Sequence, residues 1–299
     1  MDANICAAID VGSNSVRLMV ARADGPRLTI LKTGLITTRL MNGVENGILS
    51  EESIERTARA VAEHAASARE LGAACIHAFG TSALRDARNS ALFNERTEAL
   101  CGVRVSVISG VEEAQLAYAG AAPAGRCGVI DIGGGSTELI AGQDGVMLRA
   151  HSARLGAVRL MNELQGRQDP AEMLSAARAR LAETIETVCA EKPDRWVGVG
   201  GTITSLAAMT KQVDKYTPGA IENFPLDAET VRAWLYRLAG MPVEERKELI
   251  GLPPARADII AYGAAILLAV METAPASPVH ACDRDNLEGY IRKNMLPLL

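Results

Sequence analysis

Two stretches of this 299-residue chain repeat one unusual arrangement of apolar and polar residues. Residues 7–22 read AAIDVGSNSVRLMVAR, and residues 130–139 read IDIGGGSTEL. Each stretch places an apolar run before an aspartate, then a turn rich in Gly and Ser, and then a second apolar run. Short apolar runs on both sides of such a turn predict two β-strands joined as a hairpin. The repetition predicts two copies of one structural unit.

The first half of the chain alternates predicted strands with predicted helices. Runs rich in Val, Ile, Leu and Thr predict strands over residues 6–12, 16–24, 27–40 and 103–110, and a strand leading into a loop over 73–85. Helices are predicted over residues 91–100 and 111–121. Residues 50–72 predict a long amphipathic helix, because Ser50 can cap its first turn, acids follow in that turn, and Gly72 ends it.

The order of elements restarts after PAGRCG, residues 123–128, which has the composition of a hinge. Three strands are predicted within residues 127–156, a helix over 169–193, a strand, Gly turn and helix over 196–209, a strand over 278–283 and a helix over 286–299. Asp169 and Pro170 are suited to the start of the long helix. The apolar run 259–271 is too short to span a bilayer and predicts a buried helix.

This pattern is typical of a duplicated α/β protein. The sheets should be mixed, because a β-hairpin opens each half. We expect a first domain over residues 1–122 and a second over 123–285, with the C-terminal helix at about 286–299 packing back on the first.

Composition narrows the classes of partner. The net charge of −5 gives no overall basic surface for DNA or RNA, and the aromatic share of 3% leaves little surface for stacking bases. The N-terminus lacks the pattern of a signal peptide. The six cysteines form no CxxC pair, and with the four scattered histidines they do not match the spacing of a zinc site. We therefore expect buried free thiols, a cytoplasmic location, and neither a nucleic-acid nor a membrane partner.

The two turns have the chemistry of phosphate-binding loops. Glycine lets backbone N–H groups approach a small anion, and Ser, Thr and Asn add further donors. The aspartate at each strand end can hold Mg²⁺ directly or through water. A single turn of this kind is equally typical of an ordinary hairpin, but two copies, each preceded by Asp, favour phosphate. The candidate phosphate-binding residues are Gly12, Ser13, Asn14 and Ser15 in the first turn, and Gly133, Gly134, Gly135, Ser136 and Thr137 in the second.

A third glycine turn, GVGGTITS over residues 198–205, precedes a predicted helix. The N-terminus of a helix presents unpaired N–H groups and can bind an anion. Close packing of a strand against a helix would explain the same glycines. Gly200, Gly201 and Thr202 are therefore a third candidate loop.

These residues resemble the exopolyphosphatase and guanosine pentaphosphate phosphohydrolase family, within the superfamily of actin, sugar kinases and heat-shock chaperone ATPases. The matching segments are spread over nearly the whole chain in the family's order: AAIDVGSNSVRL, GTSALRDARN, VISGVEEAQLAYAG, VIDIGGGSTEL, LGAVRL, GVGGTITSLAAM and RADIIAYGAAIL. The resemblance implies two actin-like, ribonuclease H-like domains with mixed sheets flanked by helices, and an active-site cleft between them.

The resemblance also implies roles for single residues. It makes Glu113 the catalytic general base, although residues alone allow Glu112 and Glu113 to be ordinary acids of a first helical turn. It places Asp131 and Glu138 beside the second turn as metal ligands, with Asp10 as the partner acid of the first turn. Glu138 could otherwise be a solvent-facing strand residue.

Basic residues complete the expected site. Arg85 matches the family's basic residue near the phosphate chain, where a guanidinium can bind phosphate with two hydrogen bonds. Arg17 and Arg39 are further candidates for this lining, and a solvent-exposed position is the alternative for both.

The expected function is Mg²⁺-dependent release of terminal phosphate from inorganic polyphosphate, with Mn²⁺ and a monovalent cation as further ions that the resemblance allows. The chain lacks the family's extra C-terminal helical domains and is acidic, which favours short polyphosphate. The altered segment Asp283-Arg284-Asp285-Asn286 keeps the acid of the family's SDGALREG motif at Asp283 but departs from the motif from Arg284 to Leu287, and Gly289 is retained. Guanosine pentaphosphate, a nucleotide of the stringent response, is the alternative substrate. A non-catalytic phosphate-chain sensor, an actin-like assembly module and a kinase are the alternative classes. The resemblance further implies a homodimer.

Overall fold

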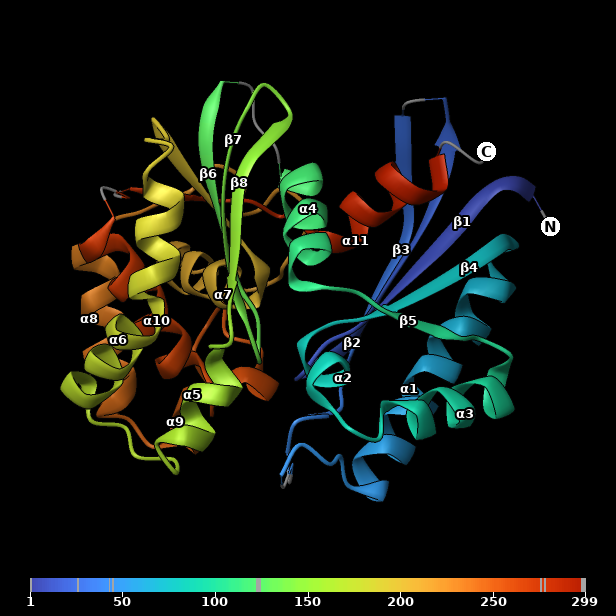
Figure 1. Ribbon diagram of the computed structural model, residues 1–299, viewed down its shortest axis with the longest axis horizontal. Coiled ribbons are helices and arrows are strands. Elements are labelled where there is room, and N and C mark those ends of the chain that lie inside the picture. Colours follow the sequence, from blue (N-terminus) through green and yellow to red (C-terminus); the bar gives the residue numbers. More distant parts are fainter. Residues whose placement is uncertain are drawn as a thin grey trace. The chain divides into compact units, whose positions relative to one another are not determined.

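The chain divides into two compact units in a computed structural model. The structure describes residues 2–25, 27–42, 44, 46–121, 125–274, 276 and 278–296. Unit 1 comprises Met1–Gly120 with Asn286–Leu299, and unit 2 comprises Ala121–Asp285. Each unit contains one mixed β-sheet flanked by helices (Figure 1). The predicted fold class, α/β with two mixed sheets flanked by helices, is confirmed.

Unit 1 is built on a five-stranded sheet with the order β3-β2-β1-β4-β5. Its strands are β1 (Asp2–Val11), β2 (Ser15–Asp24), β3 (Arg27–Thr37), β4 (Ala73–Gly80) and β5 (Val105–Val107). Its helices are α1 (Glu51–Glu70), α2 (Ser82–Asp86), α3 (Ser90–Cys101), α4 (Gly110–Ala121), α11 (Asn286–Tyr290) and the π-helical turn η2 (Ile291–Met295).

Unit 2 is built on a six-stranded sheet with the order β10-β11-β9-β6-β7-β8. Its strands are β6 (Arg126–Ile132), β7 (Thr137–Gln143), β8 (Val146–Ala153), β9 (Arg195–Val199), β10 (Pro225–Leu226) and β11 (Val279–Ala281). Its helices are α5 (Ala157–Glu163), α6 (Pro170–Cys189), α7 (Gly200–Lys211), α8 (Ala228–Ala239), α9 (Val243–Arg246), the 3₁₀ turn η1 (Pro254–Arg256) and α10 (Ile260–Thr273).

The two sheets repeat one topology. In both, an antiparallel hairpin, β1–β2 or β6–β7, is extended by a third antiparallel strand, and the hairpin's first strand pairs in parallel with β4 or β9. The correspondence extends just beyond β5 and β11, the strands that pair with β4 and β9. There, Ile108 N donates to Gly80 O at 3.0 Å, and Cys282 N donates to Gly198 O at 2.9 Å. The repeated sequence pattern therefore corresponds to a repeated backbone.

Each unit has its own apolar core. In unit 1, alternate residues of β1 and β2, including Ala8 and Met19, pack with Leu287 and Ile291 of the C-terminal helical segment. In unit 2, α10 is buried from Ile260 to Met271 and lies against α6 and α8 (Figure 1). A helix that is apolar on all sides must be buried in this way, so the prediction of a buried helix at 259–271 is confirmed. Among the described residues, no helix is both long and apolar enough to cross a membrane.

The caps predicted for two long helices are present. The Ser50 side chain accepts a hydrogen bond from Ser53 N at 3.2 Å, and that of Asp169 accepts one from Glu172 N at 2.8 Å. All six cysteines are free thiols, as predicted, although three of them are only partly buried.

Some short elements differ from the predictions. The expected loop after β4 contains helix α2, and neither α5 nor β10 was predicted. Helices of five to seven residues, and a strand of two, are too short to give a period in the sequence, which explains the difference. The predicted C-terminal helix is a single turn of α11 continued by η2, and residues 297–299 of that prediction lie outside the described residues. Residues 123 and 124 of the predicted hinge also lie outside them.

Candidate functional site

The two glycine turns have the same hydrogen bond at their base. Gly12 N donates to Ser15 O at 3.0 Å, and Gly133 N donates to Ser136 O at 3.0 Å. Both turns lie at the C-terminal end of the first hairpin strand, β1 or β6. The predicted phosphate-binding residues of each turn are therefore together within their own unit.

Carbonyl groups of both turns are bonded to a supporting segment of the same unit. In turn 1, Asn14 O accepts from Thr38 N at 3.0 Å and Arg39 N at 2.8 Å, and Ser13 O accepts from Met41 N at 3.1 Å. Because a trans peptide directs its N–H opposite to its C=O, the N–H groups of Asn14 and Ser15 point away from that segment.

The same arrangement holds in turn 2. Gly134 O accepts from Val158 N at 2.9 Å and Arg159 N at 3.0 Å, and Gly133 O accepts from Ala157 N at 3.0 Å. Arg159 Nε also donates to Gly135 O at 2.8 Å. Successive amides directed to one side of a turn form a concave site for an anion.

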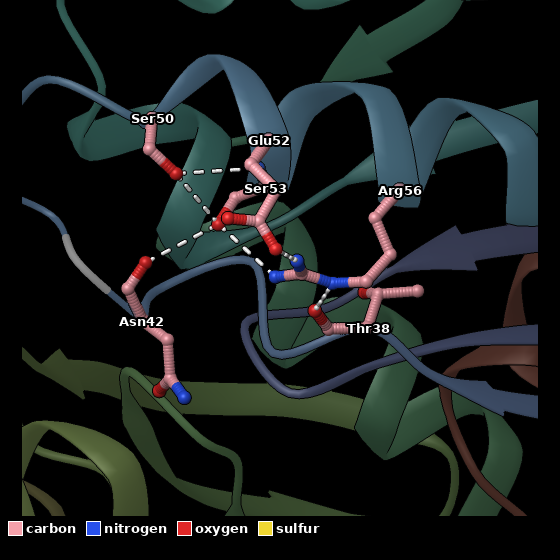
Figure 2. A network of polar contacts seen from close by, with 6 residues as sticks. All are labelled: Thr38, Asn42, Ser50, Glu52, Ser53 and Arg56. Carbon is pink, nitrogen blue, oxygen red and sulfur yellow. Dashed lines mark hydrogen bonds and ion pairs between the residues drawn. The ribbon is translucent and has the colours of Figure 1, made fainter.

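The segment that supports turn 1 is itself attached to the start of α1 (Figure 2). Arg56 donates from Nε to Thr38 O at 2.7 Å, from Nη2 to Ser53 Oγ at 3.1 Å and from Nη1 to Glu52 Oε1 at 3.1 Å. Ser53 Oγ donates to Asn42 O at 3.2 Å. The first turn of α1 thereby fixes residues 38–42, which fix turn 1.

Two carboxylates face each other beside turn 2. Asp131 and Glu138 are directly opposite in the β6–β7 register, so their side chains share one face of the sheet. They are only 6% and 0% exposed, and Glu138 Oε1 accepts a hydrogen bond from Ser152 Oγ at 2.7 Å. Burial removes the alternative that Glu138 is a solvent-facing strand residue.

The corresponding position in unit 1 carries a different pair. Asp10 lies opposite Arg17 in the β1–β2 register, and Arg17 Nε donates to Asp10 Oδ2 at 3.1 Å. A second contact joins Arg17 Nη2 to the same oxygen. Asp10 is buried and its carboxylate is part of an ion pair. This pairing was not predicted from the sequence.

The third candidate loop lies next to Asp131. Gly200 begins α7 with a φ of +83°, and a Cβ at this residue would lie 2.5 Å from Asp131 Oδ1. Glycine is therefore required here both by the backbone conformation and by the approach of the carboxylate. Arg256 Nη1 donates to Gly201 O at 2.8 Å and to Ser205 Oγ at 3.1 Å. The start of α7 and the Asp131 carboxylate thus form one region of unit 2.

The two acids at the start of α4 have different environments. Glu112 Oε2 accepts from Ser109 N at 2.7 Å, and Ser109 Oγ accepts from Glu112 N at 3.2 Å. This reciprocal pair is a capping box, and the hydrogen bond from the Ser109 amide lowers the pKa of Glu112. Glu112 is therefore occupied in capping the helix.

Glu113, the next residue, is buried. It is 5% exposed, and its Oε2 accepts from Arg85 Nη1 at 3.0 Å. The same Arg85 atom donates to Ile108 O at 3.0 Å. Arg85 is thereby joined to both the strand end and the candidate base, all within unit 1.

Thr137 and Asp283 have hydrogen-bond partners within unit 2. Thr137 Oγ1 donates to Leu155 O at 2.6 Å, so its hydroxyl proton is used inside unit 2. Asp283 accepts a hydrogen bond from Gly219 N at 2.7 Å and one from the Tyr216 hydroxyl. Burial raises the pKa of Asp283. Arg39 is half-buried with a φ of +51°.

The carboxylates of Asp131 and Glu138 are oxygen donors of the kind that binds a hard cation. Among the described residues, no group of three or more His, Cys, Asp or Glu side chains is arranged to hold a metal ion. The pair Asp131 and Glu138 nevertheless fits Mg²⁺, which keeps several waters and is often bound by one or two carboxylates together with substrate phosphate.

Comparison with known proteins finds a matching family and similar chains. A sequence model of the Ppx/GppA phosphatase family matches residues 19–297. The chain is similar to Exopolyphosphatase 2 of Mycobacterium tuberculosis, with 33% identity over 282 residues, covering 87% of this chain and 88% of that protein.

Two crystal structures share the fold over nearly their whole length. An exopolyphosphatase-like protein has a TM-score of 0.89 and 29% identity, covering 99% of this chain and 100% of that one. The Aquifex aeolicus member of the Ppx/GppA family has a TM-score of 0.80 and 30% identity, covering 98% of both chains.

Proposed function

Because the chain belongs to the Ppx/GppA phosphatase family, we propose that it is an exopolyphosphatase, which releases the terminal phosphate of inorganic polyphosphate in a Mg²⁺-dependent reaction. Its family makes it a phosphoanhydride hydrolase. The observation that carries the proposal is the pair of buried carboxylates, Asp131 and Glu138, opposite each other beside a glycine turn.

The phosphate chain binds to backbone amides in this proposal. Turn 2 directs amides of residues 134 and 135 away from its supporting segment, and turn 1 does the same with residues 14 and 15. Neutralising the charge of the transferred group in this way is the main source of catalysis in phosphoryl transfer. Asp131 and Glu138 would hold Mg²⁺, which neutralises charge on the phosphate oxygens.

Glu113 activates water in this proposal. Its carboxylate accepts one proton as the water oxygen forms a bond to the terminal phosphorus, and the bridging P–O bond breaks, leaving its electron pair on the shortened chain. Arg85 positions Glu113 through their 3.0 Å contact. The products are orthophosphate and a polyphosphate shorter by one unit.

Substrate length follows from charge in this proposal. The chain has a net charge of −5, which disfavours association with a long polyanion. We therefore expect short polyphosphate to be the better substrate.

The test compares orthophosphate release from short polyphosphate, long polyphosphate and guanosine pentaphosphate with Mg²⁺. We expect release from polyphosphate, with a kcat at least about 100-fold lower in Glu113→Gln. Glu112→Gln is the matched control, because this neighbouring acid serves the capping box. Its kcat should stay within about twofold of wild type.

Other outcomes have definite meanings. Release from guanosine pentaphosphate alone would replace polyphosphate by the nucleotide as substrate. Equal activity losses in the two variants would remove Glu113 as the base. If the folded protein releases phosphate from none of these substrates, hydrolysis is contradicted, and a non-catalytic phosphate-chain sensor becomes the preferred function.

A further inference from the structure

The two hairpins differ in charge at one equivalent position. Counting from the strand-end aspartate, the eighth residue is Arg17 in unit 1 and Glu138 in unit 2. Both lie directly opposite their aspartate in the strand register. The backbone is therefore repeated, whereas the side chain facing the aspartate changes from a cation to an anion.

This change in charge makes the two aspartates differ in how readily they can bind a cation. In unit 2, two buried carboxylates lie opposite each other in the strand register, an arrangement whose negative charge favours binding of a cation. In unit 1, Arg17 contacts Asp10 Oδ2 through Nε and Nη2, so the guanidinium already supplies at Asp10 the positive charge that a metal ion would bring. Holding Mg²⁺ at Asp10 would require that this ion pair be weakened at a buried carboxylate.

The Arg17 guanidinium is also suited to phosphate. It lies two residues beyond turn 1, and its side chain is 23% exposed against 5% for that of Asp10. A guanidinium is a planar fork that matches two phosphate oxygens. The contacts of its Nε and Nη2 to one carboxylate oxygen fix the plane of that fork.

We propose that Arg17 binds substrate phosphate at turn 1, and that Asp10 is the positioning residue for Arg17 and not a metal ligand. This inference rests on the proposed function, because it assigns the anion to the first hairpin and the cation to the second. It changes the expectation from sequence, which grouped Asp10 with Asp131 and Glu138.

The first experiment measures metal binding without turnover. Binding of Mn²⁺ to the substrate-free protein is followed by electron paramagnetic resonance in wild type, Asp10→Asn and Asp131→Asn. We expect Asp10→Asn to keep the wild-type Kd within about twofold, and Asp131→Asn to raise it by about tenfold or more. A Kd raised in Asp10→Asn as much as in Asp131→Asn would overturn the inference.

The second experiment measures anion binding. Inorganic tripolyphosphate is titrated calorimetrically in EDTA, so that neither metal nor hydrolysis contributes. We expect Arg17→Gln to weaken binding by about tenfold, and Arg17→Lys to restore part of it. Asp10→Asn should weaken binding less, and the double variant should bind no more weakly than Arg17→Gln, since Asp10 acts through Arg17.

Arg22→Gln is the matched control, because Arg22 is an exposed arginine on the same strand. It should bind tripolyphosphate like wild type. Equal effects of Arg17→Gln and Arg22→Gln would overturn the inference, as would additive losses in the double variant.

The proposed function and the inference about Arg17 and Asp10 can be contradicted independently of each other. Absence of orthophosphate release by the wild-type protein contradicts the proposed function, while both binding experiments still report on Arg17 and Asp10. Conversely, normal hydrolysis with tripolyphosphate binding unchanged in Arg17→Gln contradicts only the inference.

Discussion

Arg85 Nη1 lies 3.0 Å from Glu113 Oε2 and also 3.0 Å from the carbonyl oxygen of Ile108. One guanidinium therefore links the end of β5 to a buried acid in the first turn of α4. The position of Glu113 depends on this link, because its side chain is almost fully buried and has to be oriented by its neighbours.

Replacing Arg85 tests this dependence. We expect Arg85→Gln to lower kcat for polyphosphate by about 10- to 100-fold, since a misoriented base loses that much. Steady-state kinetics measure the effect. Arg88→Gln, an exposed arginine three residues later, is the control and should change kcat little. Equal kcat values in the two variants would contradict a positioning role for Arg85.

The Arg56 network should affect turn 1 at a distance. Arg56→Gln removes the contact to Thr38 O and weakens the hold of α1 on the segment behind the turn. We expect KM for polyphosphate to rise several-fold and the free energy of unfolding to fall by about 1 kcal/mol.

The control for Arg56 is Arg59→Gln. Arg59 is a 74% exposed arginine that pairs with Glu55 on the outside of the same helix. Such a surface pair contributes less than about 1 kcal/mol and should not alter KM. A KM that is unchanged in Arg56→Gln would show that the Arg56 contacts do not contribute to substrate binding.

Gly289 should be essential for the packing of α11 on α4. A Cβ at this position would overlap the carbonyl oxygen of Leu116, a backbone atom that cannot rotate away. We expect Gly289→Ala to lower the free energy of unfolding by about 1–3 kcal/mol. Because α4 carries Glu113, kcat should fall as well.

Gly240→Ala provides the comparison for Gly289. A Cβ there would lie 3.5 Å from Tyr236 O, an ordinary contact distance. Denaturant titration should give Gly240→Ala a stability within about 0.5 kcal/mol of wild type. Equal stabilities of the two variants would show that the close packing of α11 on α4 does not contribute to the free energy of unfolding.

Glu272 should make the stability of unit 2 depend on pH. Burial raises the pKa of Glu272, but the hydrogen bonds from Arg232 and Arg178 together lower it by more, so the net pKa lies below the ordinary value of 4.5. The unfolded chain then binds the proton more readily than the folded one. The stabilisation is therefore present above pH 4.5 and is lost as pH falls through the lower folded pKa.

Thermal unfolding between pH 7 and pH 3 measures this effect. At pH 7 we expect Glu272→Gln to be less stable than wild type by about 1–3 kcal/mol, and the difference should shrink at acid pH. Glu244→Gln, which disrupts an exposed pair with Lys247, should have little effect at either pH. A difference that is constant over this range would exclude the ion pairs as its cause.

The architecture was accessible from sequence because the repeated hairpins and long helices follow regular patterns. Ser50 and Asp169 mark helix starts through chemistry that acts over three residues. Helix α2 could not be predicted in the same way, because five residues between a strand and a turn give no period.

The candidate site was only partly accessible from sequence. Glycine turns and acids are visible as residue types, but the partner of each acid is set by strand register. A four-residue turn from Gly12 to Ser15 places Asp10 opposite Arg17, so this pair could have been found by counting residues. The difference between Glu112 and Glu113 depends on which side of α4 faces Arg85, and the first turn of a helix does not reveal that.

The equivalence of the two hairpins also shows how one backbone arrangement can carry opposite charges. The two hairpins share one strand pairing and one hydrogen bond at the base of the turn, and the residue that faces the aspartate differs between them. One copy keeps two acids, and the other balances its acid with Arg17. A reversal of charge at one equivalent position is thus enough to give two halves with the same backbone topology different electrostatic properties.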